Sequence, residues 1–313
     1  MGVGPARVAL LLVLAALPAT AVAERGPPPP TGELLLDMAD PVIAVRIGEV
    51  ALRLRVALDQ KRLIELNPDA AERLRNRPPN GRFRFESGLE GLVGRETLPS
   101  IEAAAPITLN RREMLVTVAS HGRPCCHGVD GEIGIGLLPY ATIRFVRADA
   151  SPPERSATFL IDDDDEHGPQ TRLAVGRQSI LVQFSLERKD SVATGSAGAI
   201  LAREYGGRLS DGGTMIAAFG IERPIARLRF ARPAAIGTFD YSSLPVRTAD
   251  FAGGEAFPVD PGEPDDIVVR KKIRQQQAWP VVSIGRDRLD RCSEAQYDVL
   301  ARQLTLRCAG PRG

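Results

Sequence analysis

Two acidic residues, Asp59 and Glu187, each follow an apolar stretch and are the first candidates for chemistry in this chain. Two carboxyl groups held close together repel each other when both are charged, so one keeps a proton while the other stays ionised. Such a pair can activate water with its charged member and protonate a carbonyl group with its neutral member. This chemistry requires elements that bring residues 59 and 187 together.

The segments that carry the two acids are copies of each other. Residues 52–74 read LRLRVALDQKRLIELNPDAAERL, and residues 180–202 read ILVQFSLERKDSVATGSAGAILA, aligned without a gap. In both copies apolar residues alternate with mostly polar ones, which predicts a half-buried strand that ends at the carboxylate. The matched apolar positions are Leu52, Leu54, Val56 and Leu58 in the first copy and Ile180, Val182, Phe184 and Leu186 in the second.

A second short strand and then a short helix follow each acid. The β-rich runs are residues 63–66 and 191–194. Asn67 and Pro68 suit the N-cap and first position of the first helix. Ser196 is the expected cap of the second helix, and the glycines at 206–207 should end it.

The repeat closes with an apolar-glycine landmark. Residues 130–134 read DGEIG and are followed by two leucines, and residues 282–285 read VSIG and are followed by Leu289. The repeated unit is therefore a strand, a carboxylate turn, a second strand, a short helix, a variable β segment and this landmark. Such an order predicts an all-β chain, mainly strands with short helices, folded as two similar lobes.

This layout resembles the pepsin-like and retropepsin-like aspartic peptidases, and the resemblance covers nearly all of the chain after residue 41. In that family each lobe contributes a strand ending in Asp-Thr-Gly or Asp-Ser-Gly, and an apolar-apolar-Gly motif passes beneath each acid. The resemblance implies a two-lobed acid-protease fold in which Asp59 and Glu187 face each other as the catalytic pair. Gln60-Lys61 and Arg188-Lys189 replace the family's Thr-Gly, so both motifs are degenerate.

Three features argue against peptide-bond cleavage by Asp59 and Glu187. The extra methylene of a glutamate displaces its oxygens, and a misplacement of about 1 Å can reduce a rate roughly a hundredfold. A lysine is a poor replacement for the glycine that permits a tight supporting turn. The cations at Lys61, Arg188 and Lys189 would lower the pKa of an adjacent acid and oppose a shared proton, or would form ion pairs that fill the cleft.

We therefore expect an exported aspartic-peptidase-like protein with impaired catalysis that binds or scaffolds a peptide or protein. An extended peptide would be held between the lobes by strand addition. The alternative is an active aspartic-type endopeptidase that uses Asp59 and Glu187. Neither function requires a cofactor.

Four potential metal ligands lie within seven residues at His121, Cys125, Cys126 and His127. They suggest a second alternative, a metal-handling protein for copper or zinc. Adjacent ligands would strain a tetrahedral site, and the spacing matches no standard zinc pattern, so no metal ligand is assigned. Cys125 and Cys126 would form either a strained vicinal bridge or free thiols.

Cys292 and Cys308 flank the segment that should form the closing hairpin of the second lobe. They are equally far from its midpoint near Leu300 and can face each other across two strands. We expect a disulfide here, worth about 3 kcal/mol for a loop of this length. Disulfides are typical of exported proteins.

The N-terminal residues 1–23 have the pattern of a signal peptide, with Arg7 before an apolar run and Ala-Val-Ala at 21–23. We expect removal of this segment, no remaining membrane span and a periplasmic or extracellular location. The net charge of +1 and the 5% of aromatic residues argue against nucleic acid as a partner. A monomer is expected.

The predicted organisation is a Pro-rich lead-in over residues 24–41, a first lobe over 42–165 and a second lobe over 166–313. Residues 83–94 should overhang the cleft. The acidic run at 162–166 is interpreted as a solvated linker between the lobes. The arms of the first lobe's closing hairpin should be the strand-like runs 143–146 and 158–161. We interpret residues 251–266 as a surface loop and residues 270–274 as a charged edge strand.

Overall fold

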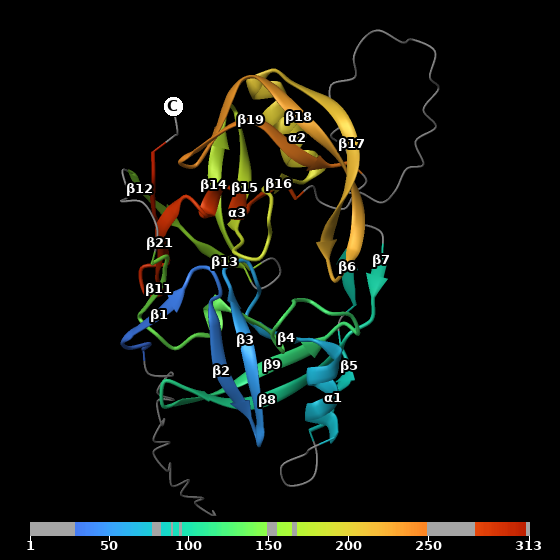
Figure 1. Ribbon diagram of the computed structural model, residues 1–313, viewed down its shortest axis with the longest axis vertical. Helices are drawn as coiled ribbons and strands as arrows, with labels where there is room; N and C mark the ends of the chain where they lie inside the picture. The colour runs from blue at the N-terminus through green and yellow to red at the C-terminus, as the bar shows by residue number, and fades with distance from the viewer. Residues whose placement is uncertain are drawn as a thin grey trace, which may run out of the picture.

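The computed structural model describes residues 29–76, 83–88, 90–93, 96–148, 155–164, 168–248 and 279–310. The chain forms two β-rich lobes, one above the other, with a smaller sheet beside the junction between them (Figure 1). The all-β, two-lobed fold expected from the internal repeat is confirmed. The predicted signal peptide and the segments at 251–266 and 270–274 lie outside the described residues.

The first lobe contains one seven-stranded sheet, a two-stranded sheet and two short helices. Its elements are β2 (Val42–Ile47), β3 (Val50–Ala57), β4 (Leu63–Leu66), α1 (Pro68–Asn76), β5 (Glu86–Ser87), β6 (Gly91–Val93), β7 (Glu96–Leu98), β8 (Ile101–Leu109), β9 (Arg112–Ser120), β10 (Gly131–Gly134) and the 3-10 helix η2 (Ile135–Leu137). An additional pairing of β2 with β8 curls the large sheet into a barrel.

The second lobe contains an eight-stranded sheet and two helices. Its elements are β13 (Asp162–Asp164), β14 (Gly168–Val175), β15 (Gln178–Phe184), β16 (Val192–Ala193), α2 (Gly195–Tyr205), β17 (Gly207–Ala218), β18 (Ile221–Ile236), β19 (Phe239–Arg247), β20 (Val281–Ile284) and α3 (Arg286–Leu289).

The strand order of one lobe matches that of the other, position by position. The first lobe has the order β2-β3-β10-β4-β9-β8-β5, and the second has β14-β15-β20-β16-β19-β18-β17 with β13 added at one edge. The directions match as well, because β3 and β10 are parallel, as are β15 and β20. The internal repeat in the sequence is thus a repeat of topology.

The alternating residues pack as predicted in the first copy and more tightly in the second. The four apolar positions of β3 and its extension, residues 52 to 58, are all at most 5% exposed. In β15, however, Leu181 and Gln183 on the opposite face are also buried. The second copy is therefore buried on both faces, and α2 contacts its strand.

The small sheet joins the lobes through strands from both halves of the chain. It has the order β1-β11-β21-β22-β12, built from β1 (Glu33–Asp37), β11 (Thr142–Val146), β12 (Arg155–Leu160), β21 (Cys292–Asp298) and β22 (Gln303–Cys308). The two strands of the first lobe do not pair as a hairpin, contrary to expectation. They lie on either side of the β21–β22 hairpin, so the two lobes share hydrogen bonds.

The predicted disulfide is present. Cys292 and Cys308 are cross-strand partners in β21 and β22, and their sulfurs are bonded. Equal distance from the hairpin tip places the two residues opposite each other, as the sequence indicated.

Two predicted boundaries differ from the structure. The lead-in contains strand β1, because Leu36 alternates inward in the sequence ELLLD and β1 pairs with β11. The acidic run contains β13, which pairs with β14, so residues 162–164 belong to the second lobe's sheet. Residues 165–167 lie outside the described part of the chain.

The helix starts show one further difference. Thr194, not Ser196, caps α2, since its hydroxyl accepts a hydrogen bond from the Ala197 amide. Gly206 ends the helix in the left-handed conformation, as predicted. Among the described residues, no helix has both the length and the apolar character to cross a membrane.

Candidate functional site

The carboxylate turns lie at equivalent places in the two lobes, each supported by the glycine of its apolar landmark. A Cβ atom on Gly134 would lie 1.8 Å from the Lys61 carbonyl oxygen. A Cβ atom on Gly285 would lie 2.8 Å from the Arg188 carbonyl oxygen. Only glycine allows the backbone to approach so closely, so the landmark glycines set the position of both turns.

Asp59 lies at the junction of the lobes and interacts with residues of the second lobe. Burial raises the pKa of its carboxyl above the ordinary value. The positive charge of Arg188 and a hydrogen bond with Ser185 oppose this rise, whereas the negative charge of Glu187 adds to it. The two repeat acids therefore influence each other across the lobe junction.

Glu187 is held by an arginine from the opposite lobe. The Nη1 atom of Arg55, on β3, donates to Oε2 of Glu187 at 2.7 Å, and its Nη2 atom donates to the His127 carbonyl at 3.1 Å. The Arg55 side chain is 16% exposed and that of Glu187 is 40% exposed. Burial opposes the charge of Arg55, but Glu187 and Asp40 raise its pKa overall. One carboxylate of the repeat is thus neutralised by an ion pair between the lobes.

A third carboxyl group, Glu132 on β10, belongs to the same site. Glu132 is the register partner of Arg55 on β3 and of Glu65 on β4, so the three side chains point to one face of the sheet. Burial and the charges of Asp59 and Glu187 raise the pKa of Glu132 to about 8. The site holds four acids against few cations, and Glu132 keeps its proton at neutral pH.

Glu65 forms its own pair with His121 beside this row. Its carboxylate is 1% exposed, and both of its oxygens lie 3.0 Å from Nδ1 of His121. The hydrogen bond with Glu65 raises the pKa of His121, while burial lowers it. A protonated imidazole is thereby favoured next to a fully buried acid.

The four turn residues predicted to modify the cleft have different roles. Gln60 accepts a hydrogen bond from the Lys61 amide, and the charge of Lys61 lowers the pKa of His121. Arg188 points inward and donates to the Ala217 carbonyl at 3.1 Å. Lys189 is exposed. In the described part of the chain, the acid Glu187 forms its ion pair with Arg55, while the charge of Arg188 acts on Asp59.

The four potential metal ligands at residues 121, 125, 126 and 127 do not converge on one point. His121 is bound to Glu65, whereas the Cys125 amide and thiol contact Asn67. His127 is exposed. In the described ranges, no group of three or more His, Cys, Asp or Glu residues is arranged to hold a metal ion.

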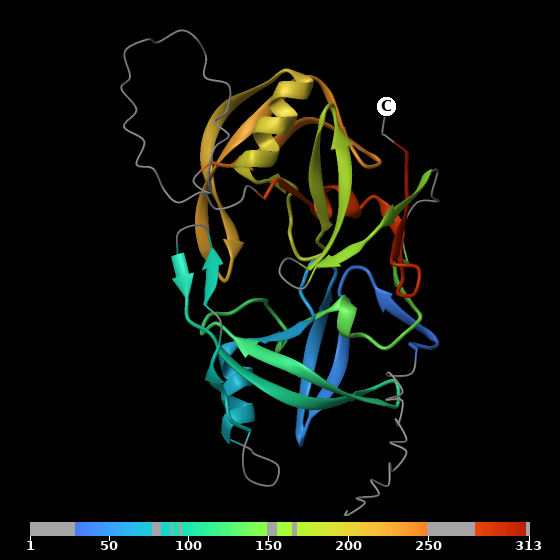
Figure 2. The same ribbon diagram turned by 180° about the vertical axis from the view of Figure 1, so that it is seen from behind.

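The second lobe reaches over to the first beside this site. The tip of the β17–β18 hairpin lies next to the β6–β7 hairpin in both views (Figures 1 and 2). Val93 and Leu98 of the first lobe form a buried apolar cluster with Ala217 and Ile221 of the second. The Phe219 ring lies 4.9 Å from the His121 ring. Residues predicted to overhang the cleft are therefore bound to the opposite lobe.

Comparison with known proteins adds little to this description. No protein-family model matches the chain, and no curated protein matches it. Among solved structures, the chain is similar to the EIAV protease complexed with the inhibitor HBY-793, at 15% sequence identity and a TM-score of 0.25. The match covers 30% of this chain and 81% of that chain.

Arg55, Glu65 and Glu132 were not predicted as site residues, because the predicted site contained only the turns after the strands. Their signal was present in the repeat. Arg55 and Glu132 are charged residues on two strands that the repeat unit brings side by side. Once β3 and β10 are known to be parallel neighbours, these two residues fall in register.

Proposed function

We propose that the chain is an exported relative of the aspartic peptidases with impaired catalysis, which binds an extended peptide or protein segment between its lobes. The observation that carries this proposal is the 2.7 Å ion pair of Glu187 with Arg55. A carboxylate neutralised by arginine is stabilised in its charged form and is a weak base for activating water. Glu187, which would be the second acid of the catalytic pair, is thereby held in an ion pair with Arg55.

The β6–β7 hairpin is the proposed docking element for the segment. It forms a separate two-stranded sheet, and no other strand of the described residues pairs with its outer edges, which are the proposed sites of strand addition. The β17–β18 tip covers this hairpin through the cluster around Val93 and Ile221. A bound segment would compete with the contact between the β17–β18 tip and the β6–β7 hairpin. Binding should therefore be accompanied by separation of these two hairpins.

Export is supported by two observations. The first residues have the signal-peptide pattern, and the Cys292–Cys308 disulfide is compatible with an oxidising compartment. N-terminal sequencing of the secreted protein should begin at Glu24. A mature protein that retains residues 1–23 would contradict the proposed processing.

A second candidate function, an active endopeptidase, is favoured by the raised pKa of Asp59. A carboxyl group with a raised pKa beside a carboxylate held in an ion pair has the inequality between two acids that acid-catalysed hydrolysis requires. In this mechanism Glu187 would activate water and Asp59 would protonate the carbonyl oxygen. The ion pair with Arg55 would have to open before Glu187 could accept a proton.

One experiment separates the two candidates. The mature protein is incubated with denatured casein from pH 3 to pH 7, with and without pepstatin, alongside Asp59→Asn. We expect no cleavage by a protein whose circular dichroism shows an intact fold. Pepstatin-sensitive cleavage that Asp59→Asn abolishes would overturn the proposal of impaired catalysis.

Binding is tested separately by hydrogen exchange in the presence of casein-derived peptides. We expect added protection over residues 91–98, the β6–β7 hairpin, and no change at the β8–β9 turn around Asn110, which lies far along the same lobe. Unchanged exchange over residues 91–98 at saturating peptide would contradict docking at this hairpin.

A further inference from the structure

Two adjacent cysteines near the site take no part in the function proposed above. The sulfurs of Cys125 and Cys126 lie 2.7 Å apart, and the two residues are not bonded to each other. A disulfide bond measures about 2.05 Å, so a movement of less than about 1 Å would join the two atoms. Two thiols in this arrangement are the reduced half of a dithiol–disulfide pair.

A single buried asparagine holds the two cysteines in place. Oδ1 of Asn67 accepts from the Cys125 amide at 2.9 Å and lies 3.4 Å from the Cys125 sulfur. Nδ2 of Asn67 donates to the carbonyls of Cys126 and Val129, both at 2.9 Å. Both sides of the loop are therefore fixed by one amide, which keeps the thiols facing each other.

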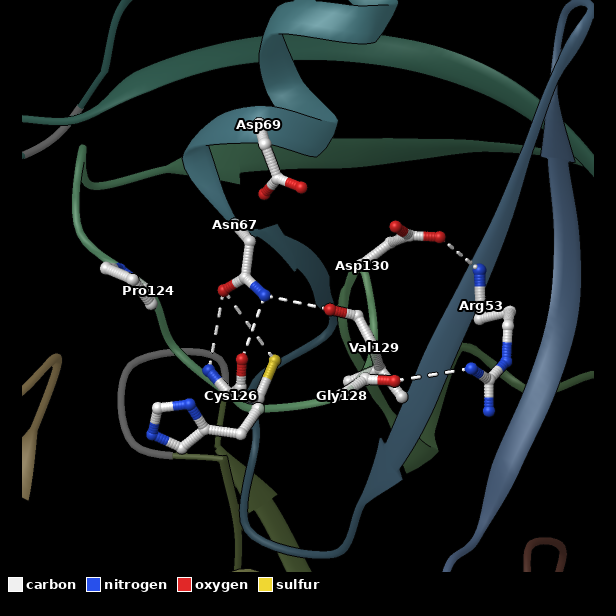
Figure 3. Close-up of a pocket in the computed structure, with 9 residues that line it drawn as sticks. Arg53, Asn67, Asp69, Pro124, Cys126, Gly128, Val129 and Asp130 are labelled. Carbon is white, nitrogen blue, oxygen red and sulfur yellow. Dashed lines mark hydrogen bonds between the residues drawn. The ribbon is translucent and has the colours of Figure 1, made fainter.

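A polar cavity of about 370 Å³ opens beside the pair (Figure 3). It is lined by Asn67 and Cys126, and by Arg53 and Asp130 on the opposite side. Cys126 is 3% exposed, whereas Cys125 is partly exposed. The cavity leaves room for a small molecule on the Cys126 side of the loop. Cys125 does not line the cavity, but it is the more exposed of the two sulfurs and therefore the one more open to attack from solvent.

We propose that Cys125 and Cys126 form a reversible vicinal dithiol–disulfide site that exchanges with low-molecular-weight disulfides. The thiolate of Cys125 attacks a disulfide RSSR, forms a mixed disulfide and releases one thiol RSH. Cys126 then attacks the Cys125 sulfur, which closes the ring and releases the second RSH. The two cysteines are oxidised, RSSR is reduced, and their two protons leave on the released thiols.

The surroundings of the pair make this exchange slow at neutral pH. Contact with Cys126 and burial raise the pKa of the Cys125 thiol, and the charge of Glu65 acts in the same direction. The thiolate is the reacting form, so the exchange rate should rise as pH increases. A disulfide between neighbouring residues also closes a small ring, because their Cα atoms lie closer together than those of ordinary disulfides. Such a bond is strained, so the oxidised form should be readily reduced.

The test equilibrates the mature protein at pH 8.5 with glutathione disulfide or with glutathione, followed by acid quenching, alkylation and peptide mass mapping. We expect two alkylated cysteines in the reduced protein, and a peptide two hydrogens lighter after oxidation with alkylation reduced about tenfold or more. The Cys292–Cys308 bond should stay intact in both samples, which makes it the internal control. Full alkylation of Cys125 and Cys126 after oxidation would overturn the proposal, as would mixed or intermolecular disulfides alone.

A second measurement uses phenylarsine oxide, whose arsenic binds two neighbouring thiols with loss of one water. The reduced protein should bind one equivalent, and Cys125→Ser, with its fold checked by circular dichroism, should bind about tenfold more weakly or worse. In the same variant, oxidation should yield only a mixed disulfide on Cys126. Equal arsenical binding by the variant and the unmodified protein would show that the two sulfurs do not act as a pair.

Discussion

At the scale of single residues, the junction between the lobes is defined by how charge is distributed among its acids. Arg55 neutralises Glu187 in an ion pair, and the positive charge of Arg188 opposes the rise that burial causes in the pKa of Asp59. Glu132 instead remains protonated at neutral pH, since it shares its surroundings with the other two acids. Asp59 and Glu132 thus both have raised pKa values, and Glu132 lies outside the two carboxylate turns, in the apolar-glycine landmark of the first copy.

Replacing Glu132 tests this distribution through the pH dependence of stability. Between the ordinary pKa of 4.5 and the raised value of about 8, the folded state binds a proton that the unfolded chain has lost. The free energy of unfolding must therefore fall as pH rises through this window. We expect Glu132→Gln to reduce the loss between pH 5 and pH 8 by roughly 3 kcal/mol, as measured by urea unfolding.

The control for this experiment is Glu113→Gln, which removes an exposed carboxylate from β9. It should leave the difference in stability between pH 5 and pH 8 unchanged. A Glu132→Gln variant with the same pH dependence as the unmodified protein would show that Glu132 ionises normally.

At the scale of elements, the β17–β18 hairpin connects the lobes beyond the small sheet. Its tip buries Ala217 and Ile221 against β6 and β7, and Arg188 binds the Ala217 carbonyl from the carboxylate turn. The second acid-bearing turn, the hairpin tip and the overhanging hairpin of the first lobe are thus connected. Movement of one of these elements must disturb the other two.

Ile221→Ala should separate the two hairpins. Ile221 is 3% exposed, and truncation of a buried isoleucine costs about 2 kcal/mol or more through lost burial and a residual cavity. We expect faster hydrogen exchange in β6–β7, residues 91–98, as well as in β17–β18. The exchange of β3 amides should stay the same.

Ile216→Ala on the same hairpin is the matched control. Ile216 is 62% exposed, so its truncation should change stability by less than about 0.5 kcal/mol. If Ile221→Ala accelerated exchange only within its own hairpin, the contact between the lobes would not be what protects β6–β7.

At the scale of the whole molecule, the five-stranded sheet makes the two lobes one folding unit. Its strands come from both halves of the chain, and the Cys292–Cys308 disulfide closes the hairpin at its centre. One hydrophobic core runs through both lobes and this sheet, and includes Phe145 of β11 and Tyr241 of β19. Unfolding of either lobe alone would break strand pairs of the other.

The double variant Cys292→Ser, Cys308→Ser should lower the free energy of unfolding by about 3 kcal/mol, because the loop closed in the unfolded chain spans 16 residues. The loss should appear in a single transition, followed both by fluorescence of Trp279 and by circular dichroism. Two separate transitions would contradict the cooperative coupling of the lobes through this sheet.

The sequence was sufficient for the fold class, the repeat and the disulfide because each depends on local periodicity or on spacing within one hairpin. Alternation over residues 52 to 58 predicted β3, and the position of Cys292 opposite Cys308 followed from the hairpin midpoint. The pairing of β11 with β21 was not predictable in the same way. It joins residues 150 positions apart, and nothing local distinguishes it from a hairpin within one lobe.

The composition of the candidate site was harder to predict for a related reason. The turns at Asp59 and Glu187 were visible because they repeat, whereas Arg55 and Glu132 have no charged counterparts in the second copy: Gln183 and Ser283 occupy the corresponding registered pair. The residues that set the charge of the site, Arg55 and Glu132, therefore lie at positions where the two copies differ. A search for symmetry alone passes over them.

The interleaved small sheet has a consequence for how the protein could be divided. The first half supplies β11 and β12, but the strands that separate and pair with them, β21 and β22, come from the second half. Two separately produced chains, residues 29–164 and 168–310, would each expose the backbone edges that the other fills. Such split halves should complement each other on mixing, because β12 of the first chain can pair with β22 of the second.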